Sequence, residues 1–167
     1  MKMLKKSLPV KTVRLVTEKR LMSDEILDNP VKVRNMLVKE LSDQPREVVA
    51  VLYLDSALHP ITIGLISMGT IDASLVNPAQ IIQTGLLCNA KSMIMFHNHP
   101  SGRLVASKDD IELTKQMVAV GKLMDMPVLD HIIIGNYSHL SMKIDGTVNF
   151  ETDKTLEELV AEAGIGI

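Results

Sequence analysis

The sequence predicts one folded domain of mixed α/β (α+β) class, with strands and helices interleaved along the chain. Short β-branched runs alternate with segments whose apolar residues recur at helical spacing. Two Asn-Pro pairs, Asn29-Pro30 and Asn77-Pro78, favour helix starts, because Asn caps a helix and Pro suits its first position. A chain of 167 residues can close one core without disulfides.

The first half of the chain predicts four elements. Residues 10–17 are β-prone and predict a strand within an N-terminal arm, residues 1–28. A helix is expected from Pro30 to about Asp43. Residues 47–55 and 61–69 predict two strands that pair as a hairpin.

The second half predicts three helices and three strands. The main domain is expected at residues 29–150, and the last helix, within residues 151–167, is expected to pack on it. The expected elements are a helix from Asn77-Pro78, a strand at 92–96 leading into His97, a helix from Ser107, strands at 127–134 and 138–142, and an acidic helix at 154–163.

Composition restricts the classes of function. The formal net charge is -2 and 2% of residues are aromatic, so neither global attraction to DNA nor base-stacking platforms are expected. Basic residues concentrate in the first twenty positions, where a solvated arm is favoured over a nucleic-acid contact. No membrane span or signal peptide is expected, which favours a cytoplasmic protein. Cys88 stands alone and is expected to be a small buried hydrophobe.

Two histidines and an aspartate have the spacing of a zinc site. Alternate residues of an extended segment point the same way, so His97 and His99 can present two imidazoles to one point. Asp110, in the first turn of the expected helix, can fold back as a carboxylate ligand. Three protein ligands leave one position for water, as in catalytic zinc sites. The pattern therefore predicts one Zn²⁺ ion and a hydrolase.

Each half of this pattern also has an ordinary explanation. A His-X-His pair can occur by chance, and Ser107 with Asp110 three residues later is the capping pattern of a helix start. A carboxylate there also suits the positive end of the helix dipole. Capping does not account for two histidines just upstream, so the combination favours a metal site.

The combination His97-X-His99, seven residues, Ser107, two residues, Asp110 resembles the JAMM (JAB or MPN-plus) metalloprotease signature. Residues 97–102 (HNHPSG) and 129–135 (LDHIIIG) resemble its bacterial RadC-like branch. The resemblance covers about residues 40–148. It implies an MPN fold, a curved mixed sheet with helices packed around it and zinc at the sheet's edge.

The resemblance also implies roles for further residues. Glu47 would be the general base that takes a proton from zinc-bound water and returns it to the leaving amine. Ser107 would place its hydroxyl near the oxyanion that forms during attack. Asp130 and His131 match a RadC-like motif and are expected to be structural or to support the zinc ligands, with Asp130 orienting a histidine.

The favoured function is a zinc peptidase or isopeptidase that acts on a peptide or protein. Other zinc hydrolases are excluded, because the chain has no His-Glu-X-X-His motif and a single Cys cannot supply a deaminase site. Three alternatives stay open: a DNA-associated module of DNA repair or mobile elements, a metal-dependent nuclease, and a noncatalytic MPN scaffold. An exposed N-terminal strand also leaves a homo-oligomer open.

Overall fold

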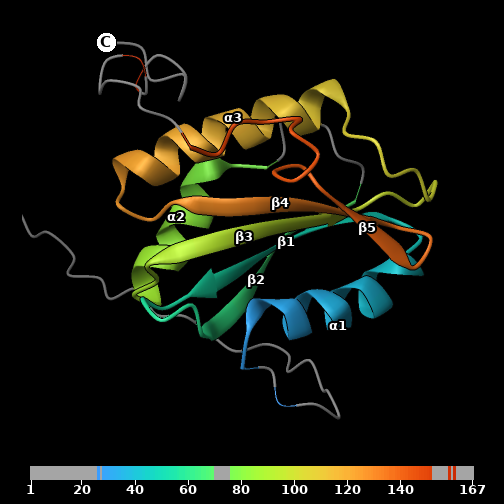
Figure 1. The fold of residues 1–167 in the computed structure, drawn as a ribbon, viewed down its shortest axis with the longest axis horizontal. Coiled ribbons are helices and arrows are strands. Elements are labelled where there is room, and N and C mark those ends of the chain that lie inside the picture. The colour runs from blue at the N-terminus through green and yellow to red at the C-terminus, as the bar shows by residue number, and fades with distance from the viewer. Residues whose placement is uncertain (1–25, 27, 70–75, 152–157, 159, 161–167) are drawn as a thin grey trace, which may run out of the picture.

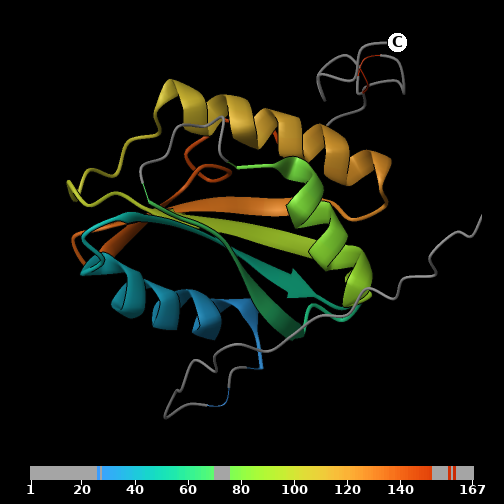
Figure 2. The ribbon, with the colours of Figure 1, turned by 180° about the vertical axis from the view of Figure 1, so that it is seen from behind.

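A computed structural model describes residues 26, 28–69, 76–151, 158 and 160. One mixed sheet with the strand order β2-β1-β3-β4-β5 lies between α1 on one face and α2 and α3 on the other (Figure 1). The view from behind shows the same layers (Figure 2). The elements are α1 (Pro30–Ser42), β1 (Glu47–Leu54), β2 (Pro60–Gly69), α2 (Pro78–Leu87), β3 (Ser92–Asn98), α3 (Lys108–Leu123), β4 (Val128–Gly135) and β5 (Ser138–Ser141). This architecture confirms the predicted fold class, with helices packed around a mixed sheet.

The central strand β1 separates two core layers. Val49, Val51 and Tyr53 pack with residues of α2 and α3, whereas Val48 and Leu52 pack with residues of α1. Successive residues of a strand point to opposite faces. Because both faces of β1 are covered, its sequence is an unbroken apolar run rather than an alternating one.

The strand pairing sets the position of the histidine segment. β1 pairs antiparallel with β2, as the predicted hairpin requires, and antiparallel with β3 on its other side. β3 pairs parallel with β4, and α3 lies in the crossover between them. β3 runs to Asn98, two residues beyond the predicted end at Phe96, because its ladder with β4 continues through His97.

The predicted helix starts are confirmed by side-chain caps. Asn29 Oδ1 accepts a hydrogen bond from the backbone N–H of Lys32 at 3.1 Å, and Asn77 Oδ1 accepts one from Ala79 at 2.9 Å. β4 and β5 form the predicted hairpin, whose turn residues Asn136 and Tyr137 have φ angles of 50° and 57°. Such positive φ values match the twist of a two-residue hairpin turn.

The remaining predictions concern the two ends of the chain, Cys88 and membrane spans. The strand predicted at residues 10–17 lies outside the described residues. Of the helix predicted at residues 154–163, only Glu158 and Val160 are described, and both are helical. Cys88 is half-buried against the α2–α3 side of the core, so it is less enclosed than predicted. Within the described residues, no helix has the length and apolarity needed to cross a membrane.

The turn after β3 packs directly on the end of β4. The His99 N–H donates to the Ile134 carbonyl at 2.8 Å. Within the turn, the Gly102 N–H donates to the His99 carbonyl at 2.8 Å. A Cβ atom added at Gly135 would lie 2.8 Å from the Gly102 carbonyl oxygen. Only glycine at position 135 permits this approach, which fixes the turn that begins at His99.

We expect Gly135→Ala to lower the free energy of unfolding by about 1–3 kcal/mol, because the added methyl overpacks against backbone atoms. Urea unfolding of the chelator-treated protein measures the change. Ser138→Ala, at an exposed position on the neighbouring strand β5, serves as the control and should be close to neutral. Equal stability of G135A and wild type would contradict the steric role of this glycine.

Candidate metal centre

The two histidines stand at the end of β3 and on one face of the sheet. In the antiparallel register with β1, His97 lies opposite Val49, whose side chain belongs to the core layer beneath α2 and α3. His99 follows two residues later, so alternation returns it to the same side. The His97 side chain is 1% exposed and that of His99 is 13% exposed. The imidazoles therefore meet at the edge of the α3 layer.

Asp110 reaches the histidines from the first turn of α3. Ser107 is the N-cap: its Oγ accepts the Asp110 N–H at 3.1 Å, and Asp110 Oδ2 accepts the Ser107 N–H at 2.7 Å. This reciprocal capping box confirms the ordinary explanation of the Ser107–Asp110 spacing. The same carboxylate also faces the imidazoles, so capping and metal binding are compatible roles of one side chain.

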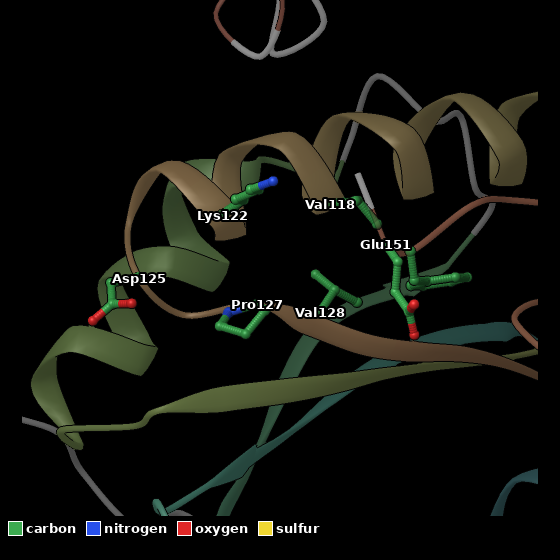
Figure 3. A pocket seen from close by; sticks show the side chains of 7 residues that line it. Val118, Lys122, Asp125, Pro127, Val128 and Glu151 are labelled. Carbon is green, nitrogen blue, oxygen red and sulfur yellow. The ribbon is translucent and has the colours of Figure 1, made fainter. Parts of the chain in front are cut away.

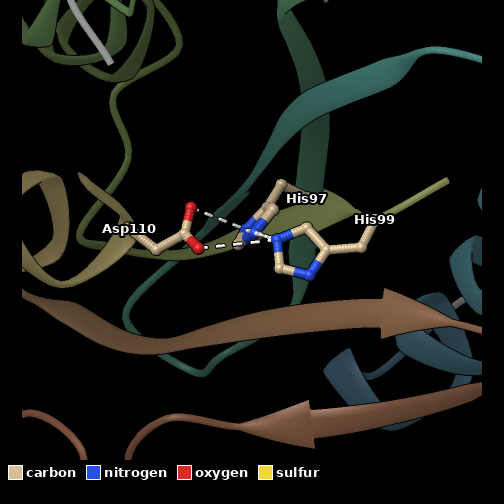
Figure 4. Close-up of side chains that lie close together, drawn as sticks. All are labelled: His97, His99 and Asp110. Atoms are coloured by element: carbon tan, nitrogen blue, oxygen red, sulfur yellow. Dashed lines mark hydrogen bonds and ion pairs between the residues drawn. The ribbon is translucent and has the colours of Figure 1, made fainter. Parts of the chain in front are cut away.

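Three ligand atoms converge on one point (Figure 4). His97 Nε2 lies 3.2 Å from Asp110 Oδ1, and His99 Nε2 lies 3.5 Å from Asp110 Oδ2. The two Nε2 atoms are 3.0 Å apart. Tetrahedral ligands at about 2.0–2.1 Å from a zinc ion are separated by about 3.3 Å. The observed separations are close to this value, although the two histidines contact different carboxylate oxygens. One ligand atom from each residue lies within 4.8 Å of the others, so the donor set is compatible with a metal ion such as zinc.

The hydrogen bond on the far side of His99 favours metal binding. Its Nδ1 lies 2.8 Å from the Arg103 carbonyl oxygen, which can only accept, so Nδ1 carries the proton. In the neutral ring, Nε2 then has a lone pair directed at the cluster. Metal-bound histidines typically donate their second ring N–H in this way.

Charge in the cluster shifts the pKa of its members. Burial opposes ionisation of Asp110, but the neighbouring imidazoles of His97 and His99 outweigh this and hold the pKa of the carboxyl far below its ordinary value. The hydrogen bond with Asp110 raises the pKa of His99, although burial opposes it. The Asp110 carboxylate therefore favours a positive charge on the His99 ring.

Glu47 begins β1 beside the cluster. Continuing the register that pairs Val49 with His97 places Glu47 opposite His99. The half-buried glutamate also acts electrostatically on His99, because its negative charge contributes to the raised pKa of that imidazole. The structure thus brings the predicted general base to the same edge of the sheet as the predicted ligands.

Asn98, between the two histidines, was missed by the sequence reasoning. Its buried side chain points to the α1 face, where Oδ1 accepts the Val48 N–H at 2.7 Å and Nδ2 donates to the Arg46 carbonyl at 3.1 Å. These are the peptide groups on the two sides of Glu47, so Asn98 positions the backbone of the predicted base. A polar residue inside a buried strand was the available signal, because such a side chain needs partners.

Asp130 and His131 have separate surroundings because alternation along β4 divides them. His131 is 1% exposed, and its Nε2 lies 2.9 Å from His97 Nδ1. Asp130 instead accepts the His131 N–H at 2.7 Å and the Ser141 hydroxyl at 2.5 Å. Of the two expectations for Asp130, these contacts agree with the structural one, since Asp130 ties β4 to β5, whereas His131 and not Asp130 lies against a ring nitrogen of His97.

A hollow lies between the C-terminal end of α3 and the start of β4 (Figure 3). Its lining includes Val118, Pro127 and Glu151 but none of the three convergent ligands. Among the described residues, the three possible metal ligands thus lie where the end of β3 meets the start of α3, and not in this hollow.

Comparison with known proteins agrees with this geometry. A family model described as the RadC-like JAB domain matches residues 27–147. The chain belongs to this family. The predicted RadC-like JAB/MPN membership is thereby confirmed.

Three curated relatives, each named UPF0758 protein, illustrate the similarity. The relative from Pseudomonas syringae pv. tomato is 45% identical over 119 residues, which cover 71% of this chain and 53% of the relative. The relative from Syntrophomonas wolfei is 40% identical over 116 residues, which cover 70% of this chain and 49% of the relative. The relative from Methanosarcina mazei is 35% identical over 122 residues, which cover 73% of this chain and 53% of the relative. This RadC-like JAB chain spans about half the length of these relatives, and their name states no activity.

We expect Asn98→Leu to destabilise the RadC-like JAB domain by about 1–3 kcal/mol, because the buried Val48 N–H loses its acceptor. The free energy of unfolding in urea measures this effect. Asn149→Leu is the matched control, since Asn149 is exposed and, among the described residues, its side chain bonds a nearby N–H, that of Glu151. A loss of stability in N98L no larger than that in N149L would refute the role of the Asn98 hydrogen bonds on the two sides of Glu47.

The raised pKa of His99 predicts a pH dependence of the metal-free protein. A folded pKa above the unfolded value of about 6.5 stabilises the fold at low pH, and this contribution declines as pH rises from about 6.5 through the folded pKa. His131 opposes this trend, because burial, and secondarily the nearby His97, hold its pKa well below the ordinary value. The stability difference between wild type and His99→Gln isolates His99.

We therefore expect that difference to decrease as pH rises above about 6.5, measured by urea unfolding from about pH 6.5 upward in the presence of chelator. His59→Gln, which removes an exposed histidine at the β1–β2 turn, provides the comparison. A constant difference between wild type and H99Q over this range would contradict the His99–Asp110 interaction.

Proposed function

We propose that this RadC-like JAB domain is a zinc-dependent hydrolase that cleaves an amide bond in a peptide or isopeptide. The observation that carries the proposal is the convergence of His97, His99 and Asp110 on one point. Two imidazoles and a carboxylate are a typical zinc ligand set that leaves a position for water. Zinc bound there would supply Lewis acidity, lowering the pKa of water and polarising a carbonyl.

Glu47 serves as the general base in this proposal. Its position across from His99 supports proton transfer from the attacking water, and the same carboxyl group then protonates the leaving nitrogen. The Asn98 hydrogen bonds on both sides of Glu47 support this role, since they restrict the backbone that presents the carboxylate. A general base of this kind contributes about 10²–10⁴-fold to a rate.

Ser107 serves as the donor to the oxyanion. Its Oγ already accepts the Asp110 N–H, which fixes the oxygen at the start of α3. The hydroxyl hydrogen is not used by that bond and can be donated to a negatively charged oxygen. Such a donor contributes roughly 3–4 kcal/mol to stabilisation of the transition state.

A peptide-library cleavage screen with zinc-loaded protein tests the proposal. We expect cleavage that chelator abolishes and added Zn²⁺ restores. Glu47→Gln should lower kcat by about 10²-fold or more and leave zinc binding intact, because the amide cannot accept the proton. Glu112→Gln, at an exposed position on α3, should cleave like wild type.

Two results would overturn the assignment. A purified protein that binds no stoichiometric zinc would refute the proposed zinc site. Wild-type cleavage by E47Q would refute the assignment of Glu47 as the general base. A parallel assay with single- and double-stranded DNA separates the reaction classes: chelator-sensitive cutting of DNA without peptide cleavage would replace amide hydrolysis by a nuclease activity.

A further inference from the structure

A chain of short contacts connects two of the proposed metal ligands behind the metal site. His97 Nδ1 lies 2.9 Å from His131 Nε2, and His131 Nδ1 lies 2.6 Å from Thr114 Oγ1. Thr114 Oγ1 lies 2.5 Å from the Asp110 carbonyl oxygen. The contacts therefore run from the His97 ring, through two buried side chains, to the backbone of Asp110.

The direction of each hydrogen bond follows from the one group that can only accept. The Asp110 carbonyl has no proton, so the Thr114 hydroxyl donates to it. A hydroxyl has a single proton, and its other contact with the Met142 sulfur is longer, at 3.6 Å. Thr114 Oγ1 must therefore act as the acceptor toward His131 Nδ1–H.

The same reasoning continues through His131 to His97. His131 is fully enclosed and its ring nitrogens face a hydroxyl and another imidazole, not a carboxylate, so the ring is neutral and has one N–H. Since that proton is on Nδ1, Nε2 accepts from His97 Nδ1–H. The Nε2 atom of His97 is then left with a lone pair, and it faces Asp110 and His99.

We propose that Thr114 and His131 are positioning residues that fix the metal-binding tautomer of His97 and tie its ring to the turn of α3 that presents Asp110. This inference rests on the proposed metal site and goes beyond its ligands. Thr114 stands one turn after Asp110, so its hydroxyl donates an i−4 hydrogen bond to the backbone carbonyl of that ligand. One chain of bonds thus orients donors that come from β3 and α3.

The effect is on metal affinity, since loss of a group that orients a ligating histidine typically lowers affinity by about 10–100-fold. Thr114→Val keeps the shape of the side chain and removes the hydroxyl. Thr114→Ser keeps the hydroxyl and removes a methyl. Thr84→Val is the matched control, because Thr84 Oγ1 also donates to an i−4 carbonyl, that of Gln80, but on α2.

Zinc affinity is measured by competition with a chromophoric chelator, and circular dichroism checks the fold of each variant. We expect T114V to bind Zn²⁺ about 10–100-fold more weakly than wild type. T114S should stay within a few-fold of wild type, and T84V should bind like wild type. Equal affinity of T114V and wild type would overturn the proposal, and so would an equal loss in T114V and T114S.

A second readout does not depend on any variant or on zinc. Ring ¹⁵N chemical shifts of the metal-free wild-type protein at pH 8.5 report which nitrogen of each histidine is protonated. We expect His97 and His131 to carry their protons on Nδ1. An Nε2–H tautomer at His131 overturns the chain of bonds even if zinc binds. Absence of zinc binding with the Nδ1–H tautomers present would instead refute the proposed hydrolase and leave the chain of bonds standing.

Discussion

The alternation of side chains along the end of β3 is the constraint on which the candidate site depends. His97 and His99 point toward the α3 layer, and Asn98 between them points toward α1. This tripeptide thus contributes two possible metal ligands on one face of the sheet. On the other face it contributes the Asn98 hydrogen bonds to the peptide groups on the two sides of Glu47. A shift of one residue in this strand would turn the imidazoles into the apolar α1 layer, because every side chain would change faces.

The third donor depends on a different element, the start of α3. Asp110 has enough lone pairs to cap the helix through Oδ2 and to face His97 through Oδ1. The capping bond therefore orients the carboxylate instead of competing for it. A helix N-terminus also favours negative charge, which agrees with a carboxyl that stays ionised despite its burial.

Local patterns in the sequence predicted the features that depend on neighbouring residues. The face shared by His97 and His99 follows from strand periodicity, and the position of Asp110 follows from a capping pattern. The contact between His131 and His97 depends instead on the parallel register of β3 and β4, which includes an irregularity between Met93 and Ile94. No local pattern encodes that register, so the sequence left Asp130 with two open roles, structural or orienting a histidine, and did not single out the contact of the His131 ring with His97.

The burial of the cluster explains why it favours a cation. Two imidazole nitrogens and a carboxylate meet where water is largely excluded, and their lone pairs repel one another unless a positive charge lies between them. The hydrogen bond with Asp110 raises the pKa of His99, so the cluster favours a positive charge on this imidazole. A metal ion bound there would have to displace any proton on a ligating nitrogen, because that nitrogen must be deprotonated. Metal binding at this edge of the sheet would therefore be coupled to proton release, and the hydrogen bonds behind His97 and His99 would keep their remaining protons away from the metal.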